Sequence, residues 1–430
     1  MALRKALGWT TANTVIRIGL GFFSAKVSAV FLGPAGMVLV GQIGSFMQVT
    51  AGAIGSGANT GVVNLTAELG DARADLHRLW GTAMRLVVVV AGVLAVLVAL
   101  GAWPLSAWLL FRGAYWPVIV VAGLAVVFAV ADNVLMGVLN GLKQLSLIAR
   151  AGILSTLLEF TLFVSLTYWF GVWGALFAIT GIYAGRFGIS CYLAFRSHLV
   201  PARALVGAFD RRATRELGRF YPMLLAHSIA LPLAQILVRN ITVAGVGLHQ
   251  GGYLQAAWRL SDVYLGVLTS ALGLYFMAHY SALKTESERG AMLRRTLVQM
   301  LVLTAVAASG IYVMRDVIIT VVLTRQFKPL GQVLPYQLLG DVFRMVVYPL
   351  QMALVSQRRV ATYITQAVGV QAAYVILTYL FVPAIGVRGA PRAYAISYLV
   401  VMVGLIVALR TTLRAPSAAL DTLSADPVAL

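Results

Sequence analysis

The segment LTYWFGVWGALFA, residues 166–178, recurs near the end of the chain as LTYLFVPAIGVRGAPRA, residues 377–393. Both copies contain LTYxF followed by GVxGAxxA, and the glycines that begin the second part, Gly171 and Gly386, are 215 residues apart. Shared apolar composition does not by itself produce two spaced motifs in register. The repeat therefore predicts a duplicated chain with two similar halves.

The composition places both halves in a membrane. The chain of 430 residues is 60% hydrophobic and only 11% charged, with a mean hydropathy of +0.88, whereas soluble domains are ~45–50% apolar and ~25% charged. Runs of about 20 apolar residues, the length that a helix needs to cross ~30 Å of hydrocarbon, recur along the sequence. The alternating pattern of barrel strands is absent. The expected fold is an all-α polytopic membrane protein.

The apolar runs predict twelve transmembrane helices, the first of which reads as a span and not as a cleaved signal peptide. They lie near residues 9–31, 37–66, 81–103, 115–140, 146–169, 172–196, 220–245, 250–281, 296–314, 329–355, 360–383 and 388–410. The longest polar interruption, 197–219, divides them six and six. We expect a bundle over 1–205, a second bundle over 206–415 and a flexible cytoplasmic tail over 416–430. Six helices per half predict parallel repeats with a central cavity between them.

The net charge of +19 follows the loops. With the N-terminus in the cytoplasm, 21 Lys and Arg residues fall on the cytoplasmic side and six on the opposite side. This bias is a strong positive-inside signal and predicts that both termini are cytoplasmic. The basic balance is therefore a feature of membrane topology and does not indicate a nucleic-acid partner.

Ten charged residues lie in the interiors of the predicted spans, where charge is costly and marks candidate functional sites. The cations are Arg17, Lys26, Arg186, Arg239, Arg259 and Arg344, and the acids are Asp132, Glu159, Asp262 and Asp341. Lys26 and Arg239 could extend to the interface. Arg259 with Asp262, and Asp341 with Arg344, are spaced i, i+3 and could form pairs within one helix. Asp132 and Asp341 both lie in the fourth helix of their half.

Pairing leaves an excess of two cations, and Arg17 and Arg186 have no neighbour of opposite sign on their own helices. Such residues must face protein or a water-filled cavity. An excess of arginine predicts a cationic cavity for an anionic ligand, because the guanidinium fork suits phosphate. The four acids are then counter-ions, or coupling sites for H⁺ or Na⁺.

Motifs for catalysis are missing. The sequence has no phosphate-binding loop of the form G-x-x-x-x-G-K-[ST], no H-E-x-x-H and a single cysteine, Cys191. No loop exceeds about two dozen residues, which leaves no room for a soluble catalytic domain. We therefore expect no catalytic residue, no metal site, no cofactor other than a coupling ion, and transport in place of a reaction.

Several segments resemble the Wzx-type polysaccharide (lipid-linked oligosaccharide) flippases of the MOP superfamily, in particular the branch that serves enterobacterial common antigen synthesis. The matching segments are KVSAVFLGPAG (26–36), LPLAQILVRN (231–240), LSDVYL (260–265), YQLLGDVFRM (336–345) and GVRGAPRAY (386–394). The resemblance covers nearly the full chain. It places Lys26, Arg239, Asp262 and Asp341 in family segments, whereas Arg259 falls just before one and has a weaker assignment.

The resemblance implies two six-helix bundles around a V-shaped cavity, as in MATE transporters. It implies translocation of undecaprenyl-pyrophosphate-linked oligosaccharide from the cytoplasmic to the periplasmic leaflet of the bacterial inner membrane, by alternating access, for O-antigen or common-antigen synthesis. A polysaccharide polymerase and a chain-length regulator are implied partners. Two alternatives stay open from the residues alone: a cation-coupled multidrug or metabolite exporter, which would favour an acidic cavity, and a membrane subunit of glycan assembly that transports nothing.

Overall fold

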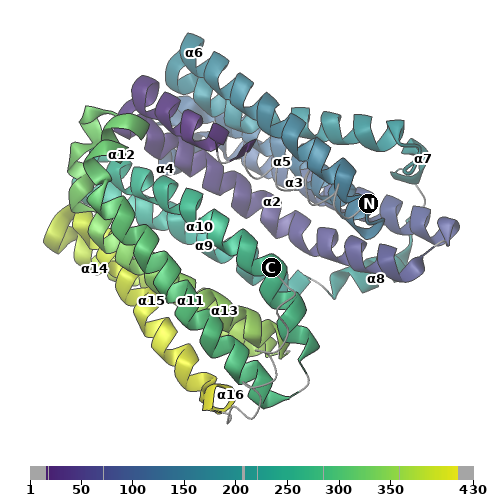
Figure 1. Cartoon of the computed structure of the whole chain (residues 1–430). Coiled ribbons are helices and arrows are strands. Elements are labelled where there is room, and N and C mark those ends of the chain that lie inside the picture. The colour runs from purple at the N-terminus through teal and green to yellow at the C-terminus, as the bar shows by residue number, and fades with distance from the viewer. Residues whose placement is uncertain are drawn as a thin grey trace. The chain divides into compact units, whose positions relative to one another are not determined.

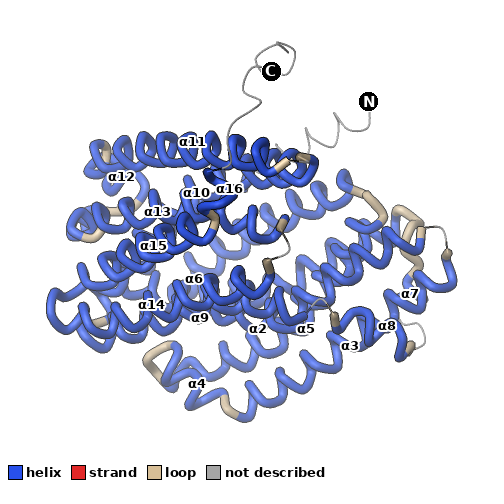
Figure 2. Tube along the Cα trace, turned by 90° about the horizontal axis from the view of Figure 1, so that it is seen from below, coloured by secondary structure: helices blue, strands red, loops and turns tan. Residues whose placement is uncertain are grey.

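A computed structural model describes residues 16–414 of the chain, apart from 18, 71, 206–208, 220, 284 and 358. The described residues form helices and short connections and contain no strand (Figures 1 and 2). Internal contacts divide the chain into a first unit, residues 1–240, and a second unit, residues 241–430. This division falls 35 residues after the boundary expected at 205. The expected boundary between the two bundles stays a prediction. The expected tail, 416–430, lies outside the described residues.

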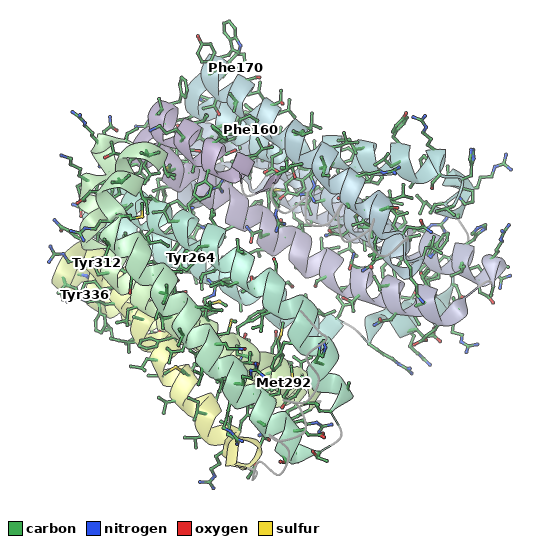
Figure 3. All side chains as sticks on the ribbon, in the orientation of Figure 1. Phe160, Phe170, Tyr264, Met292, Tyr312 and Tyr336 are labelled. Atoms are coloured by element: carbon green, nitrogen blue, oxygen red, sulfur yellow. The ribbon has the colours of Figure 1, made fainter. Side chains whose placement is uncertain are left out.

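The first unit begins with helical residues 19–27 and the π-helical turn η1 (Ser28–Leu32). Its further elements are α2 (Gly33–Leu69), α3 (Arg73–Leu100), α4 (Ala102–Leu109), η2 (Gly113–Tyr115), α5 (Trp116–Gly141), α6 (Leu145–Arg196), α7 (Ala202–Leu205), α8 (Arg211–Gly218) and most of α9 (Tyr221–Val246). α6 holds two helices that meet at Gly171, and Phe170 lies at the tip of this hairpin (Figure 3).

The second unit repeats this order of long and short helices. It contains α10 (Leu248–Ala282), α11 (Glu286–Val313), α12 (Arg315–Val322), η3 (Arg325–Gln332), α13 (Leu334–Ser356), α14 (Val360–Ile385), η4 (Gly386–Arg388), α15 (Gly389–Ala408) and α16 (Arg410–Arg414). α3 and α11 each have 28 residues, and the α4 and α12 that follow each have eight. The matching lengths extend the repeat beyond the motif that first indicated it.

The turns of the two units also match in backbone conformation. Gly171 and Gly386 have φ of 55° and 66°, in the left-handed region that glycine adopts without steric cost, and Gly33 and Gly247 have φ of 63° and 89°. A third turn closes with a hydrogen bond from the amide of Gln144 to Leu139 O at 2.9 Å, and its counterpart runs from Arg359 to Leu354 O at 2.9 Å. This pair is again offset by 215 residues, so the duplication is present in the backbone.

Small residues bring α2 and α5 close together. A Cβ added to Gly55 would lie 2.6 Å from Asn133 Nδ2, and one added to Gly141 would lie 2.6 Å from Thr66 Cβ. Asn59 Nδ2 donates to Asn133 O at 2.6 Å where the helices approach. Close packing of the two helices is therefore a sufficient reason for Gly55 and Gly141.

The outer faces of the helices are apolar, as expected for contact with lipid. Eight stretches of the described chain are long and apolar enough to cross a membrane. Three of them have 49 to 52 residues and are Gly19–Leu69, Leu145–Arg196 and Val360–Ala408. Each of the three contains one of the positive-φ glycines and therefore holds two helices. The protein is a multi-pass membrane protein of helices, and the count of twelve stays a prediction.

Candidate functional site

Five of the ten candidate charged residues lie in or beside three separate polar clusters. The first unit contains the Arg239 cluster (Gln42, Ser45, Gln235, Arg239 and Asn240) and the Asp132 cluster (Asp132, Tyr183, Arg186 and Ser190). The second unit contains the Asp341 cluster (Ser261, Tyr264, Gln337, Asp341 and Tyr394) with Arg344 beside it. The clusters share no residue.

Asp341 lies fully buried on α13 and accepts four hydrogen bonds. Ser261 Oγ and Tyr264 Oη, both from α10, donate to Asp341 Oδ2 at 2.5 and 2.8 Å. Gln337 Nε2, one turn earlier on α13, and Tyr394 Oη of α15 donate to Oδ1 at 3.1 and 3.0 Å. Tyr264 projects from α10 in Figure 3. Four donors fill the acceptor positions of an ionised carboxylate, so the arrangement suits a buried anion that ties three helices together.

Arg344 lies one turn after Asp341 and is half-buried. It is close enough to Tyr394, Tyr398 and Asp262 to interact with each of them. Asp262 is exposed on α10, and Arg259 is half-buried one turn before it. The structure thus shows Asp262 facing an arginine of another helix, and Asp341 satisfied mainly by neutral donors. Arg344 also acts on Asp341 through its charge, as the i, i+3 spacing suggested, but the spacing did not indicate the donors from other helices.

Arg239 is the largest fully buried side chain of the described residues, with 1% exposure. Its Nε donates to Gln42 Oε1 at 3.0 Å and its Nη2 donates to Ser45 Oγ. Gln42 Nε2 donates in turn to Asn240 Oδ1 at 2.6 Å, and Ser45 Oγ donates to Gln235 Oε1 at 3.3 Å. These side chains fix α9 to α2. A guanidinium buried to this extent does not face a ligand in this conformation, and it does not extend to an interface.

We expect Arg239→Met to lower the free energy of unfolding by about 2 kcal/mol, because two buried acceptors lose a charged donor. Thermal unfolding in detergent measures the change. The matched control is Arg295→Met, which removes an exposed arginine of α11 and should leave the melting temperature unchanged. If Arg239→Met kept the wild-type melting temperature and lost only substrate affinity, Arg239 would be a ligand contact after all.

Asp132 on α5 faces α6. Its Oδ2 lies 3.9 Å from Arg186 Nη2, and its side chain is hydrogen-bonded by Ser190. The side chain of Asp132 is 7% exposed and that of Arg186 is 42% exposed, so the arginine reaches solvent while the carboxylate is buried. Within the described part of the chain, Asp132 Oδ1 has no hydrogen-bond partner. Arg186, which has no acid on its own helix, thus finds one on the neighbouring helix.

The two buried aspartates are not equivalent in the repeat. Asp132 lies nine residues before the end of α5 at Gly141, whereas Asp341 lies 15 residues before the end of α13 at Ser356. The offset of 215 at the following turn pairs Asp132 with Val347. The two acids therefore lie on corresponding helices but at different heights along them.

The other candidates stand apart from these clusters. Arg17 and Glu159 are exposed, and Glu159 is close enough to Tyr183 to interact with it. Lys26 is half-buried and has an interaction partner. Among the described residues, no three His, Cys, Asp or Glu side chains gather as a metal site would require.

Known proteins similar to this chain are flippases and transporters. It is 26% identical over 405 residues to the lipid III flippases of Escherichia coli K12 and Shigella flexneri, an alignment that covers 93% of this chain and 96% of each relative. No protein-family model matches. Among solved structures, it is similar to lipid II flippase MurJ in an inward closed conformation (TM-score 0.76, 13% identity, covering 93% of this chain and 87% of that one). It is also similar to an inward-facing MATE-family multidrug resistance transporter of the MOP superfamily (TM-score 0.72, 16% identity, covering 93% and 98%). The fold of this chain is similar to that of these two transporters.

None of these similar proteins is named as an enzyme, in agreement with the missing catalytic motifs. The three clusters differ in whether their charged groups can bind a ligand. The Arg239 and Asp341 clusters are buried and satisfied by neutral partners, which suits packing. Arg186, Arg259 and Arg344 are only partly buried, so their guanidinium groups retain hydrogen-bond donors for an anion.

Proposed function

We propose that this protein moves an oligosaccharide linked to undecaprenyl pyrophosphate across the bacterial inner membrane, from the cytoplasmic to the periplasmic leaflet. The similarity to lipid III flippases over 93% of the chain carries the proposal. The similarity of the fold to a MOP-superfamily transporter supports transport as the activity, and the excess of basic residues on one side supports cytoplasmic termini. The movement is by alternating access, and a polysaccharide polymerase and a chain-length regulator are the proposed partners.

Three arginines are the proposed contacts for the pyrophosphate. Arg259 and Arg344 in the second unit and Arg186 in the first lie within membrane helices and are partly buried. A guanidinium within a membrane helix costs free energy unless an anion compensates for its charge. Asp262 beside Arg344 and Asp132 beside Arg186 would hold the arginines in place before the substrate binds. Arg17, Lys26 and Glu159 are assigned to the same path with less direct support, since they belong to none of the clusters.

The test is headgroup affinity in nanodiscs. Undecaprenyl-pyrophosphate-linked oligosaccharide is titrated against wild type, Arg259→Gln and Arg344→Gln, with Arg295→Gln as a control that removes one exposed charge from the same unit. We expect each of the first two variants to weaken binding about tenfold or more, because a hydrogen bond to a charged group contributes about 1.5 to 3 kcal/mol. The control should bind like wild type.

A second measurement distinguishes the flippase from the exporter. The exporter is a second candidate because the fold is similar to that of a MATE-family multidrug resistance transporter. Proteoliposomes that contain the lipid-linked oligosaccharide are assayed for its appearance in the outer leaflet, and parallel vesicles for uptake of a cationic drug. Translocation of the lipid without drug uptake supports the flippase. Drug uptake without lipid movement would replace it with the exporter, and activity toward neither would leave a membrane subunit that transports nothing.

A further inference from the structure

The duplicated motif carries different chemistry in its two copies. The copies GVWGALFA (171–178) and GVRGAPRA (386–393) differ at three positions, and two of these changes exchange aromatic residues for arginine. Trp173 corresponds to Arg388, and Phe177 corresponds to Arg392. At each of the eight positions, the two copies agree in whether the residue is buried, half-buried or exposed. Arg388 and Trp173 are exposed, and Arg392 and Phe177 are half-buried.

The turn itself does not require arginine. In the first unit the same backbone carries an aromatic group, in which Trp173 stacks on Phe177 at 6.1 Å between ring centroids and contacts Tyr115 at 4.8 Å. Exposed aromatic residues of this kind are typical of membrane interfaces. Two arginines in the second copy therefore need a reason other than the fold of the turn.

The two arginines of the second unit are held side by side by neutral groups. Arg388 Nη2 donates to Gln332 Oε1 at 2.7 Å, and Arg392 Nη2 donates to Tyr336 Oη at 2.7 Å. The Arg392 guanidinium also lies over the Tyr336 ring, 4.4 Å from its centroid. Because 332 and 336, like 388 and 392, are spaced i, i+4, the contacts form two rungs between neighbouring helices. We call these four residues the arginine ladder.

The ladder leaves most of its hydrogen-bonding capacity unused. Each guanidinium has five N–H donors, and the contacts above use one of them. The Nε of Arg392 is buried and has no hydrogen-bond partner in the described part of the chain. The described contacts of Arg388 and Arg392 include no carboxylate. The ladder is thus a fixed pair of charges that lacks a counter-ion.

The position of the ladder makes this charge unfavourable for the protein alone. Arg388 is the residue that caps the start of α15, and Arg392 lies in the first turns of this helix, which begins at Gly389. A helix N-terminus is the positive end of the helix dipole, and like charges at i, i+4 repel each other. An anion bound across both arginines would relieve both effects. Local arrangements that disfavour folding in this way are expected at functional sites.

Further cations lie on α12 and η3, the segments that precede α13 in the second unit. Arg325 and Lys328 are exposed on η3, the segment that also carries Gln332. Arg315 begins α12 and lies over the ring of Tyr312, 4.5 Å from its centroid, and its Nε is 3.9 Å from Asp316 Oδ1, so its charge is partly compensated. Tyr312 and Tyr336 project at the same end of the unit in Figure 3. The basic surroundings would attract an anion, and the ladder supplies the two forks that would bind it.

We propose that the arginine ladder is a phosphate-binding site that receives the pyrophosphate of the lipid-linked substrate at the end of its translocation. Two guanidinium groups one helical turn apart match an anion with two adjacent phosphates, each of which accepts parallel hydrogen bonds. The site rests on the proposed function for its ligand and on the proposed topology for its side, which is periplasmic. It is distinct from the arginines within the membrane helices, which would bind the headgroup earlier.

The experiment uses the full chain in phosphatidylcholine nanodiscs and a readout local to the ladder. Undecaprenyl pyrophosphate without sugar is titrated, and hydrogen–deuterium exchange of residues 386–395 is followed, so that binding elsewhere does not contribute. The test variant is R388W/R392F, which installs the side chains of the other copy on the same turn. R388Q/R392Q serves as a second test variant, and R325Q/K328Q removes two charges from the same end without touching the ladder.

In wild type we expect the ligand to slow exchange in this segment. The concentration for half the effect should rise at least tenfold in R388W/R392F and in R388Q/R392Q, and change little in R325Q/K328Q. Without ligand, R388W/R392F should melt at the wild-type temperature or above it, because the repulsion is gone. A melting temperature lowered in both ladder variants would instead show that the arginines are structural.

Three other outcomes would overturn the site. Equal losses in R325Q/K328Q would reduce the ladder to a diffuse basic surface. If phosphatidylglycerol slowed exchange and undecaprenyl pyrophosphate did not compete with it, the ladder would be a site for ordinary phospholipid. Slowing by undecaprenol would show that the lipid tail and not the phosphate is recognised. The proposed function and the site can also fail separately. If undecaprenyl pyrophosphate slows exchange at residues 386–395 but the wild-type protein does not translocate the lipid-linked substrate, the proposed function is contradicted and the phosphate site is retained.

Discussion

Asp341→Leu is expected to lower the free energy of unfolding by about 3 kcal/mol, the largest loss from any single polar side chain of the second unit. The carboxylate is fully buried and accepts hydrogen bonds from Ser261, Tyr264, Gln337 and Tyr394. Removal of the acceptor leaves four buried donors from three helices without a partner, and leucine fills the space without restoring any of the bonds.

Thermal unfolding in detergent measures the loss, and two variants isolate its cause. Asp341→Asn keeps one acceptor oxygen and should cost about half as much. Asp132→Leu removes an equally buried acid whose contacts are one hydrogen bond from Ser190 and a distant arginine, and it should cost about 1 kcal/mol. If Asp132→Leu and Asp341→Leu were equally damaging, burial of the side chain and not its donors would set the cost.

Gly389→Ala is expected to cost about 2 to 4 kcal/mol, because the alanine Cβ meets backbone that cannot move aside. A Cβ at this position would lie 2.6 Å from Phe381 C and 2.6 Å from Val382 N, where α14 turns back through η4 into α15. The repeat-equivalent Gly174 is more constrained still, since its Cβ would overlap the carbonyl of Leu166. Residues 166 and 381 are themselves 215 apart, so both copies of the motif use this glycine for the same close approach.

The control is Gly404→Ala, also in α15, where no atom lies within 4 Å of the added Cβ. That change should be neutral or stabilise the helix by up to about 1 kcal/mol, because alanine is the better helix former. Melting temperatures of the two variants in one detergent give the comparison. A Gly389→Ala variant as stable as Gly404→Ala would mean that the turn opens easily and that the glycine has no packing role.

Most of the helical architecture was predictable from apolar runs. The expected spans 115–140, 220–245, 250–281 and 360–383 agree within two residues with α5, α9, α10 and α14. α3 and α11 begin eight and ten residues earlier than expected, because helices continue beyond the hydrocarbon into polar sequence. Thr285 and Glu288 form a capping box at the start of α11, a signal that would have corrected this boundary. The short α4 and α12 were not expected, since they fall in the gaps that follow the expected spans 81–103 and 296–314.

The candidate site was predictable in its residues and not in its contacts. Charges within apolar runs were sufficient to single out Asp341, Arg344 and Asp132. Apart from Gln337 on the same helix, the donors to Asp341 come from other helices, 53 to 80 residues away in the case of Ser261, Tyr264 and Tyr394, and no spacing within one helix indicates these three. Arg239 shows the limit most clearly, because a mid-helix arginine looks the same in sequence whether it is buried among amides or open to a ligand.

The matching turns at Gly171 and Gly386 bear on how this gene has diverged since its duplication. The backbone of the motif, its glycines and its pattern of exposure are the same in both copies, while the residues at its two outward positions have changed completely. Natural selection could therefore alter the chemistry of one end of the protein by point mutation, with no insertion, deletion or change of topology. We expect related genes to differ first at these two positions. We expect them to retain the glycines, because the glycines form the turn whichever side chains these positions carry.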